Sequence, residues 1–117
     1  MATIKVFGIP NCDTIKKTMN WFKQQKINIE FCDYKRSGIT KEKLEAWCEL
    51  AGWELLLNKK STTWKGLTLK VQKEANNQST AIKLMMENTS IIKRPVIEFG
   101  EKLIVGFNEE AYTKTFK

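Results

Sequence analysis

The stretch that decides the fold is residues 3–34, TIKVFGIPNCDTIKKTMNWFKQQKINIEFCDY. Residues 3–7 are rich in β-branched and aromatic side chains and alternate, which is typical of a strand, and residues 8–11 end it. From Cys12 onward, apolar side chains recur at helical spacing and predict an amphipathic helix, with Asn11 as its N-cap. Residues 27–34 alternate again. Because a helix joins them, the two strands are expected to be parallel, with a right-handed crossover.

The middle of the chain is predicted to be helical. Thr40 is expected to cap a helix over residues 40–51 that ends at Gly52. Residues 53–57 predict a short helical turn, and residues 61–63 are expected to cap a weaker helix that begins at Trp64. Ser79 or Thr80 is expected to cap one further helix. The side chains of that helix expected to face inward are Ile82, Met85 and Met86.

After Arg94-Pro95 the apolar period returns to two. Residues 96–99 and 102–105 predict two strands joined by Gly100-Glu101, and glycine first in a two-residue loop favours a type II′ hairpin. Asn108 is expected to cap a last helix, with Phe107 packed on Tyr112 as a hydrophobic staple. The order is βαβ, a helical middle, then ββα, which predicts one α/β domain over residues 1–117 with a helical insertion at about residues 40–90.

Composition narrows the classes of function. The 117 residues are 42% hydrophobic and 28% charged, as in ordinary globular domains, and no apolar run approaches the ~20 residues of a membrane span. Three cysteines cannot form a closed disulfide framework and fit a reducing compartment, so a cytoplasmic location is expected. The chain has no histidine, which excludes Ser/His/Asp triads and histidine-ligated metals, and three scattered cysteines predict no zinc site.

The net charge of +7 has three readings: a nucleic-acid binder, a docking face for an acidic protein, or a site for small anions. Of the 20 basic residues 18 are lysines, and their dispersal along the chain favours solvated helix faces. No groove-reading motif or basic stripe occurs, so direct binding of nucleic acid is not expected.

Cys12 is the first candidate for chemistry, because it stands where a strand passes into a helix. Unpaired N–H groups and the positive end of the helix dipole lower a thiol pKa there and favour a nucleophilic thiolate. The positive charge of Lys16 would favour the Cys12 thiolate, and the negative charge of Asp13 would disfavour it. Asn11 and Thr14 could hydrogen-bond the thiolate or a bound oxyanion. The alternative is that Cys12 is a small buried residue, Asn11 a cap and Thr14 a first-turn residue.

The other cysteines are weaker candidates. Cys48 lies on an apolar helical stripe and is expected to serve packing. Cys32 lies in a predicted strand, and it could resolve a mixed disulfide with Cys12 only if their Cα atoms lie within ~7 Å of each other.

Arg94-Pro95 is the second candidate. A bond that precedes proline can be cis, and arginine offers a planar fork of donors that suits carboxylates and oxyanions. Lys59, Lys60 and Lys93 could enlarge an anion site. The alternative is that all four basic side chains are simply solvated.

Several motifs, in the right order over almost the whole chain, resemble the ArsC family, which includes arsenate reductases and Spx transcription regulators, and the YffB-like branch is the most similar. The resemblance implies a thioredoxin-like fold with a helical insertion. The motifs are FGIPNCDTIKK at residues 7–17, Asp33-Tyr34, GWELLLN at residues 52–58, Thr62-Thr63-Trp64, IIKRP at residues 91–95 and Gly106-Phe107.

The resemblance also implies an activity and partners. Cys12 would be the redox nucleophile, Arg94 would bind an oxyanion or thiol cosubstrate, and the Arg94-Pro95 bond would be cis. Glutathione would be the cosubstrate, with no bound cofactor, and glutaredoxin would regenerate the thiol in the arsenate-reducing members. The expected substrate is a small oxyanion or an oxidised thiol. The residues expected to bind it are Asn11, Thr14, Lys16, Lys60, Lys93 and Pro95.

This chain departs from the family pattern in three places. Lys59-Lys60 and residues 106–108 stand where glutaredoxin-linked arsenate reductases carry arginines, so arsenate coordination is reduced. Ile15 stands where Spx proteins carry the second cysteine of Cys-x-x-Cys, so that disulfide switch cannot form. The leading hypothesis is a glutathione-dependent thiol oxidoreductase that uses Cys12, and the alternative is an Spx-like regulator that docks on RNA polymerase without catalysis.

Overall fold

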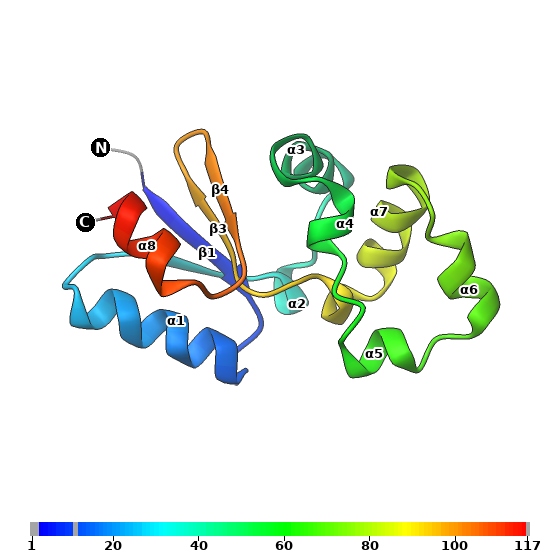
Figure 1. Cartoon of the computed structure of the whole chain (residues 1–117), viewed down its shortest axis with the longest axis horizontal. Helices are drawn as coiled ribbons and strands as arrows, with labels where there is room; N and C mark the ends of the chain where they lie inside the picture. The colour runs from blue at the N-terminus through cyan, green and yellow to red at the C-terminus, as the bar shows by residue number, and fades with distance from the viewer. Residues whose placement is uncertain (1–2, 11, 117) are drawn as a thin grey trace. The chain divides into compact units, whose positions relative to one another are not determined.

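The computed structural model describes residues 3–10 and 12–116, which fall into two compact units (Figure 1). The sheet unit comprises Met1–Asp33 and Arg94–Lys117, blue and orange to red in Figure 1, and the helical unit comprises Tyr34–Lys93. The helical unit therefore begins and ends slightly outside the expected insertion at residues 40–90. That residues 1–117 form a single domain stays a prediction.

The sheet unit has the expected order of elements. Strand β1 (Ile4–Gly8), helix α1 (Asp13–Gln24) and strand β2 (Glu30–Asp33) form the βαβ half, and strands β3 (Val96–Phe99) and β4 (Lys102–Val105) with helix α8 (Glu109–Phe116) form the ββα half. The sheet order is β2-β1-β3-β4, with β1 parallel to β2 and antiparallel to β3. This is a thioredoxin-like α/β fold, and the prediction of parallel strands is confirmed.

Both helices of this unit pack on one face of the sheet. Ile4 and Val6 alternate along β1, and Ile97 pairs with Val6 across β3, so these side chains share a face. They form one core with Trp21 and Phe22 of α1 and with Tyr112 of α8. A Cβ atom on Gly8 would overlap the side chain of Ile15, so the glycine lets α1 begin close against β1.

The local predictions for the second half are confirmed. Gly100 has φ +61°, and Lys26 is the one non-glycine residue with positive φ in the described part of the chain, so the hairpin fits type II′ and not type I′. The Asn108 side chain accepts a hydrogen bond from the Ala111 N–H at 3.0 Å. The Phe107 and Tyr112 rings lie 5.5 Å apart, as a hydrophobic staple requires.

The helical unit consists of short helices. They are α2 (Tyr34–Ser37), α3 (Lys41–Ala51), α4 (Trp53–Leu56), α5 (Thr62–Lys65), α6 (Leu69–Glu74), α7 (Gln78–Glu87) and the 3-10 helix η1 (Thr89–Ile91). Thr40 caps α3 and Ser61 caps α5, as predicted. A bridge between Leu57 and Ile92 connects the residue that follows α4 with the residue that follows η1. Among the described residues, the helices are too short or too polar to span a membrane.

Several details differ from the sequence prediction. Strand β2 covers Glu30–Asp33 rather than residues 27–34, because its ladder with β1 begins at the Lys5 to Glu30 pair and Tyr34 starts α2. Helix α5 begins at Thr62, two residues before the predicted start at Trp64, because the Ser61 hydroxyl caps it. Helix α6 was not predicted, because none of its residues is buried and it leaves no apolar stripe in the sequence.

The cap of α7 is another difference. Asn77, not Ser79 or Thr80, caps the helix, because its side-chain oxygen accepts from the Thr80 N–H at 3.0 Å. Ile82 and Met85 face inward as predicted, but Met86 is 42% exposed. One further residue turns a side chain by about 100° around a helix, which carries Met86 off the buried face of α7.

Candidate functional site

Cys12 occupies the N-cap position of α1, with extended φ and ψ of −104° and 134°. Its carbonyl accepts the first bond of the helix, from the Lys16 N–H at 2.9 Å. The prediction that Asn11 caps this helix is therefore wrong, and Asn11 itself lies outside the described residues. A cysteine as N-cap places its sulfur beside the unpaired N–H groups of the first turn.

The environment lowers the pKa of the Cys12 thiol. Burial acts against this, since a half-buried thiolate is less well solvated. The backbone N–H groups of Ile15 and Thr14, the charge of Arg94 and the Thr14 hydroxyl outweigh burial. The neutral thiol makes no capping hydrogen bond, so these donors act on the thiolate. The net effect favours the nucleophilic form of the sulfur.

Arg94 and Pro95 stand immediately before β3, and their peptide bond is cis, as predicted. The Pro95 carbonyl accepts from the Gly106 N–H at 2.8 Å, which connects this segment to the end of β4. Arg94 is half-buried, and its charge acts on Cys12. The structure therefore brings together three predicted site residues of the sheet unit: Cys12, Thr14 and Arg94.

Lys16 is exposed on α1 and is not among the groups in the described part of the chain that shift the Cys12 pKa. It lies instead at a hollow of about 470 Å³ in the sheet unit. Pro10, Ile15, Met19, Asn20 and Phe31 complete the lining of this hollow.

The other lysines predicted for the site, Lys59, Lys60 and Lys93, belong to the helical unit. Lys60 is exposed, and its N–H donates to the Asn58 side chain at 3.1 Å. Lys93 is half-buried, and its N–H donates to the Leu56 carbonyl at 2.7 Å. The ammonium of Lys59 lies 5.7 Å from the centre of the Trp64 ring. Their participation in a site with Cys12 stays a prediction.

The three cysteines differ in environment. Cys48 is buried in α3, and burial, with a smaller contribution from Glu45, raises its pKa, so the prediction that it serves packing is confirmed. Cys32 is half-buried in β2 opposite Phe7, and its role as a resolving thiol stays a prediction. Across residues 3–10 and 12–116, no group of three or more cysteine and acidic side chains is placed to hold a metal ion.

Sequence reasoning missed two contributors to this site. The Ile15 N–H is a backbone donor, and it could have been found once Cys12 was taken as the N-cap, because Ile15 is then the third helical residue. The Thr18 hydroxyl donates to the Thr14 carbonyl at 2.9 Å and is fully buried on α1. The sequence signal for Thr18 was a polar residue within the apolar stripe of the helix.

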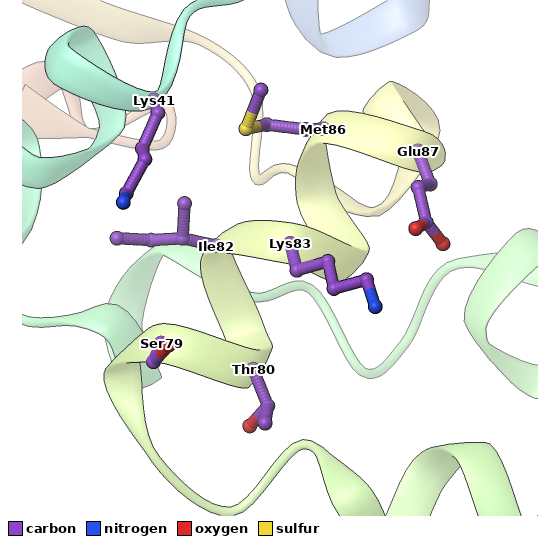
Figure 2. A pocket seen from close by; sticks show the side chains of 7 residues that line it. All are labelled: Lys41, Ser79, Thr80, Ile82, Lys83, Met86 and Glu87. Carbon is purple, nitrogen blue, oxygen red and sulfur yellow. The ribbon is translucent and has the colours of Figure 1, made fainter.

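A second hollow, of about 400 Å³, lies in the helical unit (Figure 2). In Figure 2 the side chains of Lys41, Ile82 and Met86 point toward one another, whereas Lys83 and Glu87 project from the other side of α7. The lining thus combines the apolar side chains of Ile82 and Met86 with the lysines Lys41 and Lys83.

The sheet unit, with Cys12 at the start of α1 and Pro95 directly before β3, defines a protein of the thioredoxin-like class. The chain belongs to the ArsC family, whose family model matches residues 7–115. The resemblance predicted from the sequence motifs is therefore confirmed.

Similar proteins cover almost the whole chain. An uncharacterized protein of Haemophilus influenzae is 39% identical over 97% of this chain and 98% of its own length. The structure of the YFFB protein matches with a TM-score of 0.93 and 39% identity, over 98% of this chain and all of that one. The solution structure of an arsenate reductase (ArsC) related protein from Brucella melitensis matches with a TM-score of 0.77 and 37% identity, over 98% of this chain and 95% of that one.

More distant relatives are regulators. The regulatory protein MgsR of Bacillus subtilis is 26% identical over 95% of this chain and 88% of its own length. The global transcriptional regulator Spx of Streptococcus agalactiae is 26% identical over 92% of this chain and 78% of its own length. The similar proteins thus include one named as related to arsenate reductase and two named as regulators.

Proposed function

We propose that this protein is a glutathione-dependent thiol oxidoreductase in which the Cys12 thiolate is the nucleophile. The observation that carries the proposal is the position of Cys12 at the N-terminus of α1, where N–H donors and Arg94 lower its pKa. A thiolate, not a thiol, attacks disulfide sulfur, so a lowered pKa is the property that the reaction requires.

The reaction proceeds by two exchanges. The Cys12 sulfur attacks one sulfur of an oxidised thiol substrate, forms a mixed disulfide and releases the other half as a thiolate. Glutathione thiolate then attacks the sulfur of the bound half. Cys12 leaves as a thiolate, and a disulfide that contains glutathione is released. One cysteine of the protein suffices, so Cys32 and Cys48 are not needed.

Arg94 serves the anionic groups of the reaction. Its guanidinium favours the thiolate of Cys12 and can pair with a carboxylate of glutathione or with an oxyanion. Lysines at positions 59 and 60, and the absence of arginine at residues 106–108, leave fewer forked donors for a tetrahedral oxyanion. An oxidised thiol is therefore the favoured substrate over arsenate.

The test is turnover of a mixed disulfide between glutathione and a small thiol. Cys12 attacks the glutathione sulfur and releases the small thiolate, and a second glutathione then forms oxidised glutathione, which is followed through glutathione reductase and NADPH. We expect Cys12→Ser to abolish turnover and the matched variants Cys32→Ser and Cys48→Ser to retain it. Arsenate offered in place of the disulfide is expected to give much slower turnover. Equal rates for Cys12→Ser and the unmodified protein would overturn the proposal.

A second candidate function is docking on RNA polymerase, and the helical unit supports it. This unit carries eleven basic and six acidic residues, a net charge of +5 out of the chain's +7. Within residues 3–10 and 12–116, the exposed large apolar side chains also all belong to it: Leu50, Leu55, Leu69 and Met86. Basic charge around exposed apolar groups suits an acidic protein partner.

A pull-down with purified polymerase subunits tests this second candidate. We expect specific retention that falls when Lys41 and Lys83, two lining residues of the hollow in Figure 2, are both changed to glutamate. The control is the double change of Lys23 and Lys114, which lie in the sheet unit and carry the same charge. No retention of any subunit would eliminate docking as the function.

A further inference from the structure

Two buried hydroxyl groups lie between α1 and α8 in the sheet unit. Thr18 is the one buried polar residue in the described part of the chain, and Tyr112 is equally inaccessible. A hydroxyl taken from water into a core destabilises the fold unless it is hydrogen-bonded. Their bonding partners therefore indicate what these two residues contribute.

The Thr18 hydroxyl bonds toward the N-terminal end of α1, where Cys12 lies. It donates to the Thr14 carbonyl at 2.9 Å, two residues from Cys12. A hydroxyl has one proton to donate, and that of Thr18 is used in this bond. Thr14 in turn contributes its N–H and its hydroxyl to the Cys12 thiolate.

The Tyr112 hydroxyl reaches toward the other half of the site. It donates to the Gly106 carbonyl at 2.8 Å, and the Gly106 N–H donates to the Pro95 carbonyl at 2.8 Å. Gly106 has φ +89°, a conformation that favours glycine, and it is buried, as is Pro95. The neighbour of Pro95 is Arg94, the charge that acts on Cys12.

These bonds form two buried anchors, one from Thr18 to Thr14 and one from Tyr112 through Gly106 to Pro95. Each anchor ends beside a group that stabilises the Cys12 thiolate. A tyrosine needed only for packing could be a phenylalanine, because the ring alone makes the contacts with Trp21, Phe22 and Phe107. The hydroxyl is the part of Tyr112 that connects α8 to the thiol site.

We propose that Thr18 and Tyr112 are positioning residues for the thiol chemistry: their hydroxyls hold the first turn of α1 and the Arg94-Pro95 segment where both act on Cys12. This inference rests on the proposed function of Cys12. It adds that a residue of α8, Tyr112, influences the reactivity of the Cys12 thiol without contacting the sulfur.

The test is the pH dependence of Cys12 alkylation by iodoacetamide, resolved from Cys32 and Cys48 by peptide mass spectrometry. We expect Tyr112→Phe and Thr18→Val to slow alkylation at pH 7 by about threefold to tenfold, because a tenfold loss of thiolate corresponds to a rise of one in pKa. Thr18→Ser restores the hydroxyl and is expected to restore the rate. Each variant is first shown to be folded by its melting curve.

Phe116→Leu is the matched control, because Phe116 packs on the same aromatic cluster but belongs to neither anchor. An equal slowing in Phe116→Leu, or unchanged alkylation in both Tyr112→Phe and Thr18→Val, would overturn the positioning role. In either case a low pKa of Cys12 in the unmodified protein would leave the proposed function standing. An ordinary pKa there would instead remove the proposed function itself.

Discussion

Arg94 acts on the thiol of Cys12 although the two residues lie in different halves of the sheet unit. The charge of Arg94 lowers the Cys12 pKa together with the N–H groups at the start of α1. The relationship depends on the sheet, because β3 follows Arg94 directly and pairs with β1, the strand that leads to Cys12. The pairing of β1 with β3 thus brings Arg94 of the second half near Cys12 of the first half.

Replacement of Arg94 is expected to raise the Cys12 pKa. Arg94→Gln removes the charge, so alkylation of Cys12 at pH 7 should slow several-fold, while Arg94→Lys keeps the charge and should slow it less. Turnover with glutathione should fall in both variants, because lysine lacks the planar fork. Arg36→Gln, in the helical unit, is the control. A rate of alkylation in Arg94→Gln equal to that of the unmodified protein would contradict the role given to Arg94.

Gly8→Ala is expected to destabilise the fold by about 1–3 kcal/mol, the usual cost of overpacking a core. The added Cβ would overlap the buried side chain of Ile15, which must then move at the start of α1. The measurement is urea unfolding. Gly66→Ala serves as the comparison, because its Cβ would meet its neighbours at an ordinary 3.5 Å. A similar unfolding midpoint for the two variants would show that the fold does not need the close approach.

The stability of the fold should decrease as the pH rises from about 10 to 12. Burial raises the pKa of Tyr112 to about 12, although the Thr18 side chain and the Asn108 backbone lower it in part by favouring the phenolate. An unfolded tyrosine loses its proton near pH 10, so above that pH the unfolded chain is favoured until the folded phenol also ionises near 12. Urea unfolding at pH 8 and pH 11 measures the effect. Tyr112→Phe should lose less stability over this interval, and an identical loss would refute the assignment.

Asn77→Ala should cost about 1 kcal/mol of stability, since it removes the side-chain cap of α7. Ser79→Ala should change stability little, because Ser79 lies inside the helix and is not its cap. Urea unfolding of the two variants distinguishes the observed cap from the one predicted from sequence. A larger loss in Ser79→Ala would reverse the assignment.

The sheet unit could be predicted from the sequence because its signals are local and repeated. A helix connects β1 to β2, so the two strands are expected to be parallel. The hairpin and the Asn108 cap each depend on a few neighbouring residues. Predictions failed where signals compete or are absent. Three capping side chains occur within residues 77–80, and only geometry selects Asn77. Helix α6 buries nothing, so no periodicity marks it.

The site was predictable in part. The position of Cys12 between a strand and a helix pointed to the thiolate, and Arg94 beside Pro95 pointed to the cation. The contribution of Tyr112 could not be predicted, because its hydroxyl reaches the site through the backbone of Gly106, which only the fold brings near. Its packing on Phe107 was visible as a staple, and that contact concealed the second role of the residue.

The most direct test of the central claim is the pKa of Cys12 in the unmodified protein, measured from the pH dependence of its alkylation with Cys32 and Cys48 resolved separately. We expect a Cys12 pKa below ~8.5, the value of a free thiol, and a Cys48 pKa above it. A Cys12 pKa at or above ~8.5 would contradict the claim that the start of α1 and Arg94 activate this sulfur.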